Sequence, residues 1–75
     1  MKEIARKDWD YVLFQSDESY VLEVVCGTSA TYEVVIVLNR GETKRYQKEG
    51  DRFIESLAAE IRRSPTVFEK RVTGD

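Results

Sequence analysis

The sequence predicts a small α+β domain in which one amphipathic helix packs on one face of an antiparallel sheet. Between residues 9 and 39, runs of aromatic and β-branched residues alternate with turn-forming clusters, which is typical of antiparallel strands. From Asp51 onward the apolar residues recur at helical spacing instead. A chain of 75 residues with 41% hydrophobic content suits one globular domain spanning residues 1–75.

Three strands are expected in the first half of the chain, at residues 9–15, 20–26 and 31–39. The clusters SDES and GTSA separate them as turns. The sequence NRGE after the third strand suits a short hairpin loop, because its glycine accepts unusual backbone angles. Residues 42–47 then form a fourth, polar strand at the sheet edge, where charged side chains hinder unwanted pairing.

A helix is expected at residues 51–63. Its apolar residues fall on one stripe: Phe53, Ile54, Leu57, Ala58 and Ile61. Asp51 is the expected N-cap, and Pro65 ends the helix because the residue before a proline avoids helical angles. Residues 66–72 are a candidate fifth strand. The element order is therefore ββββα, or ββββαβ if that strand forms.

Both faces of the middle strands are apolar. Valines at positions 21, 25, 35 and 37 alternate with another apolar set on the opposite face. One helix covers only one face, so the second is covered by the termini or by another molecule. Contiguous exposed apolar surface usually marks an interface. We therefore expect a protein partner or a homodimer at the helix-free face, with these candidate contact residues: Trp9, Tyr11, Val21, Val25, Val35 and Val37.

Charge is distributed unevenly along the chain. Residues 8–39 contain six carboxylates and no lysine or arginine, although the net charge is only −2. Such a segment would steer a basic partner, and the aromatic residues within it would anchor an interface. The simpler interpretation is that the aromatic side chains pack in the core and the carboxylates keep the sheet hydrated.

Catalysis is not expected. The only cysteine, Cys26, has no histidine to activate it, because the chain contains none. Its position in the strand alternation predicts a buried, core side chain instead. One cysteine without histidine cannot build a zinc site, and SDES lacks calcium-loop spacing. We therefore expect no metal, no cofactor and no enzymatic activity.

Nucleic-acid binding is the alternative function. On the expected polar hairpin, basic residues surround one tyrosine, an arrangement that holds single strands by stacking and charge. The residues concerned are Arg40, Lys44, Arg45, Tyr46 and Lys48. Against this hypothesis, carboxylates interleave with the basic residues and the pI is about 5.2.

The N-terminal segment has no apolar run of the kind found in signal peptides, and no later run approaches the length of a membrane span. A cytoplasmic location without membrane association is expected. The sequence thus predicts a small non-enzymatic protein-binding or regulatory domain that acts through the helix-free sheet face.

Overall fold

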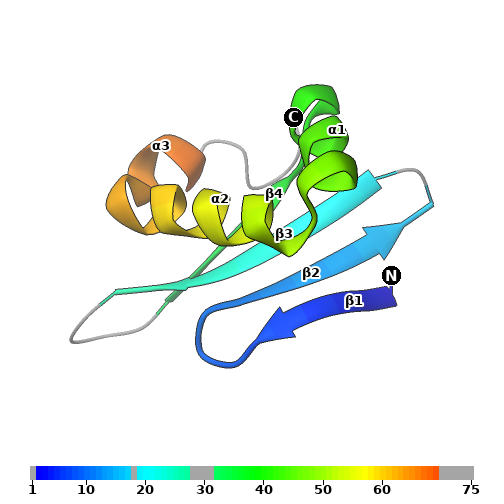
Figure 1. Cartoon of the computed structure of the whole chain (residues 1–75). Coiled ribbons are helices and arrows are strands. Elements are labelled where there is room, and N and C mark those ends of the chain that lie inside the picture. The colour runs from blue at the N-terminus through cyan, green and yellow to red at the C-terminus, as the bar shows by residue number, and fades with distance from the viewer. Residues whose placement is uncertain (1, 18, 28–31, 70–75) are drawn as a thin grey trace.

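The structure, a computed structural model, describes residues 2–17, 19–27 and 32–69 and confirms the α+β class. Four strands form one antiparallel sheet in the order β1-β2-β3-β4, and the helices lie on one side of it (Figure 1). The strands are β1 (Lys2–Lys7), β2 (Tyr11–Ser16), β3 (Ser19–Cys26) and β4 (Tyr32–Val37). The helices are α1 (Arg40–Glu49), α2 (Asp51–Arg63) and α3 (Pro65–Glu69).

The N-terminal strand β1 is an element that the sequence pattern did not indicate. It pairs with β2, with Ala5 opposite Leu13, and its register shifts between Glu3 and Ala5. Its sequence KEIARK is dominated by charged residues, so the strand depends on pairing with β2 rather than on its own propensity. Trp9, expected at the start of the first predicted strand, lies instead in the turn between β1 and β2.

The predicted polar strand at residues 42–47 is wrong, because this segment belongs to helix α1. The backbone N–H of Glu42 donates to Asn39 Oδ1 at 2.8 Å, and the backbone N–H of Asn39 donates to Glu42 Oε1 at 3.0 Å. This reciprocal capping box satisfies free amides of the first helical turn. NRGE therefore begins a helix, and the predicted hairpin does not form.

The predicted bounds of helix α2 are confirmed, but its N-cap is Gly50 and not Asp51. Asp51 lies in the first turn, where its negative charge is favourable beside the positive end of the helix dipole. The predicted strand at residues 66–72 is wrong as far as residue 69, because α3 occupies residues 65–69. Residues 70–72 lie outside the described residues.

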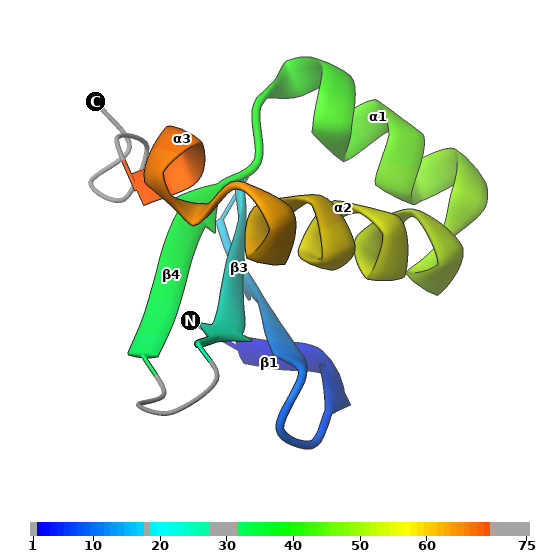
Figure 2. The same ribbon diagram turned by 90° about the vertical axis from the view of Figure 1, so that its left-hand side faces the viewer.

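The core lies between α2 and the sheet. All five residues of the predicted α2 stripe are buried, and Figure 2 shows the three helices gathered on one side of the sheet. The sheet contributes alternating residues: Tyr11, Leu13, Leu22, Val24, Cys26, Val34, Ile36 and the following Leu38. Helix α1 buries no residue and attaches through Tyr46, whose ring meets Tyr20 edge-on with centroids 5.1 Å apart.

Gly50 links α1 to α2 with φ of 69° and ψ of −145°, a region that only glycine adopts readily. Gly50→Ala should therefore lower the free energy of unfolding by about 1–3 kcal/mol in chemical denaturation. Gly41→Ala is the matched control: it lies inside α1 with ordinary space for a methyl group and should stabilise by about 0.5 kcal/mol. Equal effects of both changes would contradict this account of the linker.

Candidate protein-binding site

One face of the sheet carries no helix. We call it the helix-free face, and the strand register places on it Val12, Phe14, Val21, Glu23, Val25, Glu33, Val35 and Val37. Its six apolar residues are only half-buried. Strand β1 extends the sheet instead of covering it, and α3 packs against β4 and α2. Among the described residues, no segment lies over this face.

Most of the predicted contact residues lie together on this face, and one does not. Val21, Val25, Val35 and Val37 have the orientation that their alternation predicted. Tyr11 is a correction: it is 4% exposed and belongs to the core on the helix side, where it alternates with Val12. Val12 and Phe14 occupy the place expected for Tyr11. Once the register of β2 with β3 is known, the alternation of β2 places Tyr11 on the helix side and Val12 and Phe14 on the helix-free face.

Trp9 is the most exposed of the large apolar side chains described, at 86%. It lies in the β1–β2 turn, which is closed by the Asp10 N–H donating to the Lys7 carbonyl at 2.9 Å. Its φ of 62° is in the left-handed region, which costs a non-glycine residue roughly 1–2 kcal/mol. Because the Trp9 side chain is exposed, no packing in the core offsets this backbone strain. The turn therefore holds a strained tryptophan in contact with solvent.

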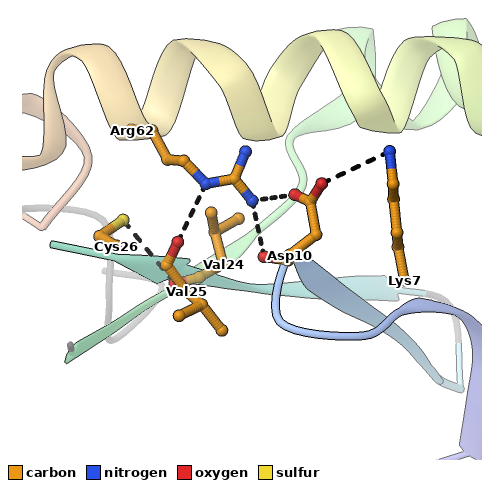
Figure 3. Close-up of polar contacts among 6 residues, drawn as sticks. All are labelled: Lys7, Asp10, Val24, Val25, Cys26 and Arg62. Atoms are coloured by element: carbon orange, nitrogen blue, oxygen red, sulfur yellow. Dashed lines mark hydrogen bonds and ion pairs between the residues drawn. The ribbon is translucent and has the colours of Figure 1, made fainter. Parts of the chain in front are cut away.

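Arg62 of α2 fixes this turn to the sheet, as Figure 3 shows. Its Nε donates to the Val25 carbonyl at 3.0 Å, and a terminal nitrogen donates to the Asp10 carbonyl at 2.8 Å. The same nitrogen pairs with the Asp10 carboxylate, which also lies 3.6 Å from Lys7 Nζ. The helix layer thus determines the position of the backbone on both sides of the Trp9 side chain.

Two open hollows adjoin Trp9, with volumes of about 250 and 290 Å³. Both are lined by Trp9, Val25 and Glu33, and Tyr32 also lines the second. The first is also lined by Glu23 and by charged residues of β1 and its turn: Arg6, Lys7, Asp8 and Asp10. We call them together the Trp9 hollow. Each is slightly smaller than the roughly 300–1,000 Å³ typical of small-molecule pockets. Their size suits a side chain that enters from another molecule.

Two carboxyl groups lie on the helix-free face: Glu23 on the inner strand β3, near the middle of the face, and Glu33 near the start of the edge strand β4. Burial raises the pKa of Glu23, and a hydrogen bond with Glu33 and the like charge of Glu33 raise it further. Arg6 lowers the same pKa, but its guanidinium also lies 3.6 Å from Glu3 and 3.9 Å from Asp8. The face therefore carries an acidic centre that its own chain neutralises only in part.

The other candidate sites do not assemble. Cys26 is 2% exposed and its sulfur faces the Val24 carbonyl at 3.8 Å, which confirms its predicted core position. The described part of the chain contains no group of three acidic, histidine or cysteine side chains placed to hold a metal ion. Nothing in the site's geometry assigns a cofactor to any of its residues.

The predicted nucleic-acid residues are placed on helix α1 and not on a hairpin. Arg45 lies 3.2 Å from Glu49, and its guanidinium stacks on Phe53 at 4.8 Å from the ring centroid. Tyr46 is half-buried against Tyr20. The tyrosine is therefore not presented on an open strand for stacking with a base. Nucleic-acid binding itself stays a prediction.

Comparison with known proteins provides no relative: no family model, no curated protein and no solved structure matches the chain significantly. Within the ranges described, none of the helices combines the length and the apolar character needed to cross a bilayer. Function has to be inferred from the helix-free face and the Trp9 hollow themselves.

Arg62→Ala should lower the free energy of unfolding by about 1–2 kcal/mol, because it removes charge-assisted bonds to two carbonyls from a side chain about one-third exposed. It should also weaken hydrogen-exchange protection at Asp10 and Val25. Arg63→Ala is the matched control in the same helical turn, and a change of less than about 0.5 kcal/mol is expected. An Arg62→Ala variant with an unchanged free energy of unfolding would show that the turn keeps its conformation without Arg62.

Glu23→Gln should stabilise the fold at neutral pH but not in acid. A carboxyl with a pKa above its ordinary 4.5 binds its proton more tightly in the folded state. The protonated form of Glu23 contributes its full stabilisation below pH 4.5. This stabilisation is lost as the pH rises through the pKa that Glu23 has in the folded protein. Replacing it should therefore add about 0.5 kcal/mol in denaturation at neutral pH, the size of a relieved like-charge pair. Glu60→Gln on α2 is the control, because it removes the same charge from an exposed position in the opposite layer.

Proposed function

We propose that this chain is a small non-enzymatic protein-binding domain that acts through the helix-free face, with Trp9 as the anchor of the interface. The observation that carries the proposal is the placement of Trp9. It combines 86% exposure with a left-handed backbone, beside an uncovered apolar face. Strained positions persist where the surrounding structure enforces them, and they cluster at functional sites.

The surroundings of Trp9 support the same proposal. Aromatic residues dominate the binding energy of protein interfaces, above all where neighbouring apolar residues exclude water around them. The half-buried Val12 and Val25 line the hollow next to Trp9 and provide such surroundings. Arg62 holds the turn in place, so Trp9 is positioned before a partner arrives and less ordering is needed on binding.

A second copy of the chain and a different protein are both possible occupants under this proposal, and the homodimer expected from the sequence is one of its forms. A photo-reactive benzoylphenylalanine at Val35, on the edge strand β4 opposite Glu23, distinguishes them. A second copy gives an adduct of twice 8.7 kDa, and another protein gives an adduct that mass spectrometry identifies. Any protein so identified is then purified and its binding is measured directly.

The control position is Ala59, which is exposed on α2 in the opposite layer. Specific adducts are expected from Val35 only. Equal labelling from both positions, or no adduct from Val35 in cells or in concentrated pure protein, would remove the helix-free face as the interface.

Trp9→Gly separates binding from folding. Glycine relieves the left-handed strain, so the free energy of unfolding should stay the same or rise by up to about 1 kcal/mol. Cross-linking from Val35 and the affinity for any identified partner should fall by about tenfold or more, as expected for an aromatic hot spot. A variant that is less stable, or that binds as well as the original, would contradict the role given to Trp9.

A further inference from the structure

We propose that the partner of the helix-free face is a protein segment that inserts a lysine or arginine side chain into the Trp9 hollow and lays apolar side chains on the surrounding valines. This inference rests on the proposed function and specifies the chemistry of the partner. It is carried by the charge and the shape of the face, and by the poor fit of a second copy.

The hollow combines features that a basic side chain satisfies. Val25 is an apolar residue in its lining, which suits the methylene stem of lysine or arginine. Trp9 lines both parts of it, and cations are attracted to aromatic rings, tryptophan most strongly. Glu23 and Glu33 also line it and accept hydrogen bonds from an ammonium or guanidinium group.

The chain's own cations neutralise the two carboxylates only in part, although Arg6 and Lys7 also line the first hollow. In the described ranges, none of the ion pairs includes Glu23 or Glu33. The nearest basic influence on Glu23 is Arg6, which is shared with Glu3 and Asp8. An apolar partner would remove this acidic centre from water without compensation, which costs affinity. A partner that supplies a positive charge complements it.

A second copy fits the face less well. Four strands of about six residues give a face of about 20 by 20 Å, or about 400 Å², which is half of what each partner of a standard interface buries. Glu23 pairs with Val12 and Val35, so it lies near the middle of this area. A two-fold axis that passes near Glu23 would bring two Glu23 carboxyl groups together, and like charges oppose that contact. A short basic segment matches both the size and the charge.

The test uses three blocked heptapeptides in which threonine and valine alternate around a central lysine, glutamine or glutamate. Trp9 is the only tryptophan of the chain, so its fluorescence reports directly on the hollow. The lysine peptide should bind about tenfold more tightly than the glutamine peptide, the ratio that one partly desolvated cation–aromatic contact and one exposed ion pair provide together. Backbone amide NMR shifts at Val25 and Glu33 confirm the location.

Glu33→Gln should reduce the preference for lysine to about threefold or less, since it removes one carboxylate from the hollow. Glu60→Gln changes the charge equally but lies on exposed α2 in the opposite layer, so the preference should remain. Raising the salt concentration should weaken the lysine peptide and leave the glutamine peptide almost unaffected.

The possible failures are distinguishable. Equal binding of the lysine and glutamine peptides at the hollow would overturn the basic partner and leave the proposed apolar interface standing. Tightest binding of the glutamate peptide would overturn the inference as well. If no peptide shifts Trp9 at millimolar concentration while light scattering shows a dimer, the occupant is a second copy and the inference is wrong. If no peptide shifts the Trp9 fluorescence and light scattering shows a monomer, both the inference and self-association are overturned.

Discussion

The structure depends on the burial of one apolar stripe of α2 against one face of the sheet. The side chains with the largest fully buried volumes all belong to this single layer: Leu13, Leu22, Val24, Val34, Ile36, Ile54 and Ile61. Among the residues that the structure describes, no second helix covers the other face, since α1 buries no residue and α3 packs against β4 and α2. The same packing that stabilises the fold therefore leaves a half-buried apolar surface behind the sheet. Because helix α2 packs on only one face of the sheet, the same packing accounts for the stability of the fold and for the exposed candidate interface.

The interface is connected to this core through Arg62. Its side chain leaves the end of α2 and reaches the carbonyls of Val25 and Asp10, which flank the hollow and the Trp9 turn. The bonds are charge-assisted and join segments far apart in the chain, so they form only when helix and sheet are already packed. The strained turn is therefore held by tertiary structure and not by its local sequence. This arrangement pre-organises the anchor of the proposed interface.

The acidic segment of the chain also divides into parts with different roles. Asp10 is neutralised by Arg62 and Lys7 and acts structurally. Glu23 and Glu33 share the helix-free face, and neither has an ion pair like the one between Asp10 and Arg62 in the described part of the chain. Burial and the neighbouring Glu33 raise the pKa of Glu23, because both disfavour its ionised form. The position of these two carboxyl groups beside the exposed Trp9 is the electrostatic basis of the proposed preference for a basic partner.

The sequence by itself determined the α+β class, helix α2, and the two faces of β3 and β4, because hydrophobic periodicity is local and strong in these segments. It did not show β1 or α1. KEIARK becomes a strand only by pairing with β2, and NRGE favours a hairpin loop although Asn39 and Glu42 have the spacing of a capping box. Four valines of the helix-free face followed from alternation, whereas Tyr11 was misplaced because the register of β2 was unknown. The exposure and backbone strain of Trp9, and its attachment through Arg62, were decided by tertiary structure alone. They arise from contacts between residues up to 52 positions apart, which no local pattern encodes.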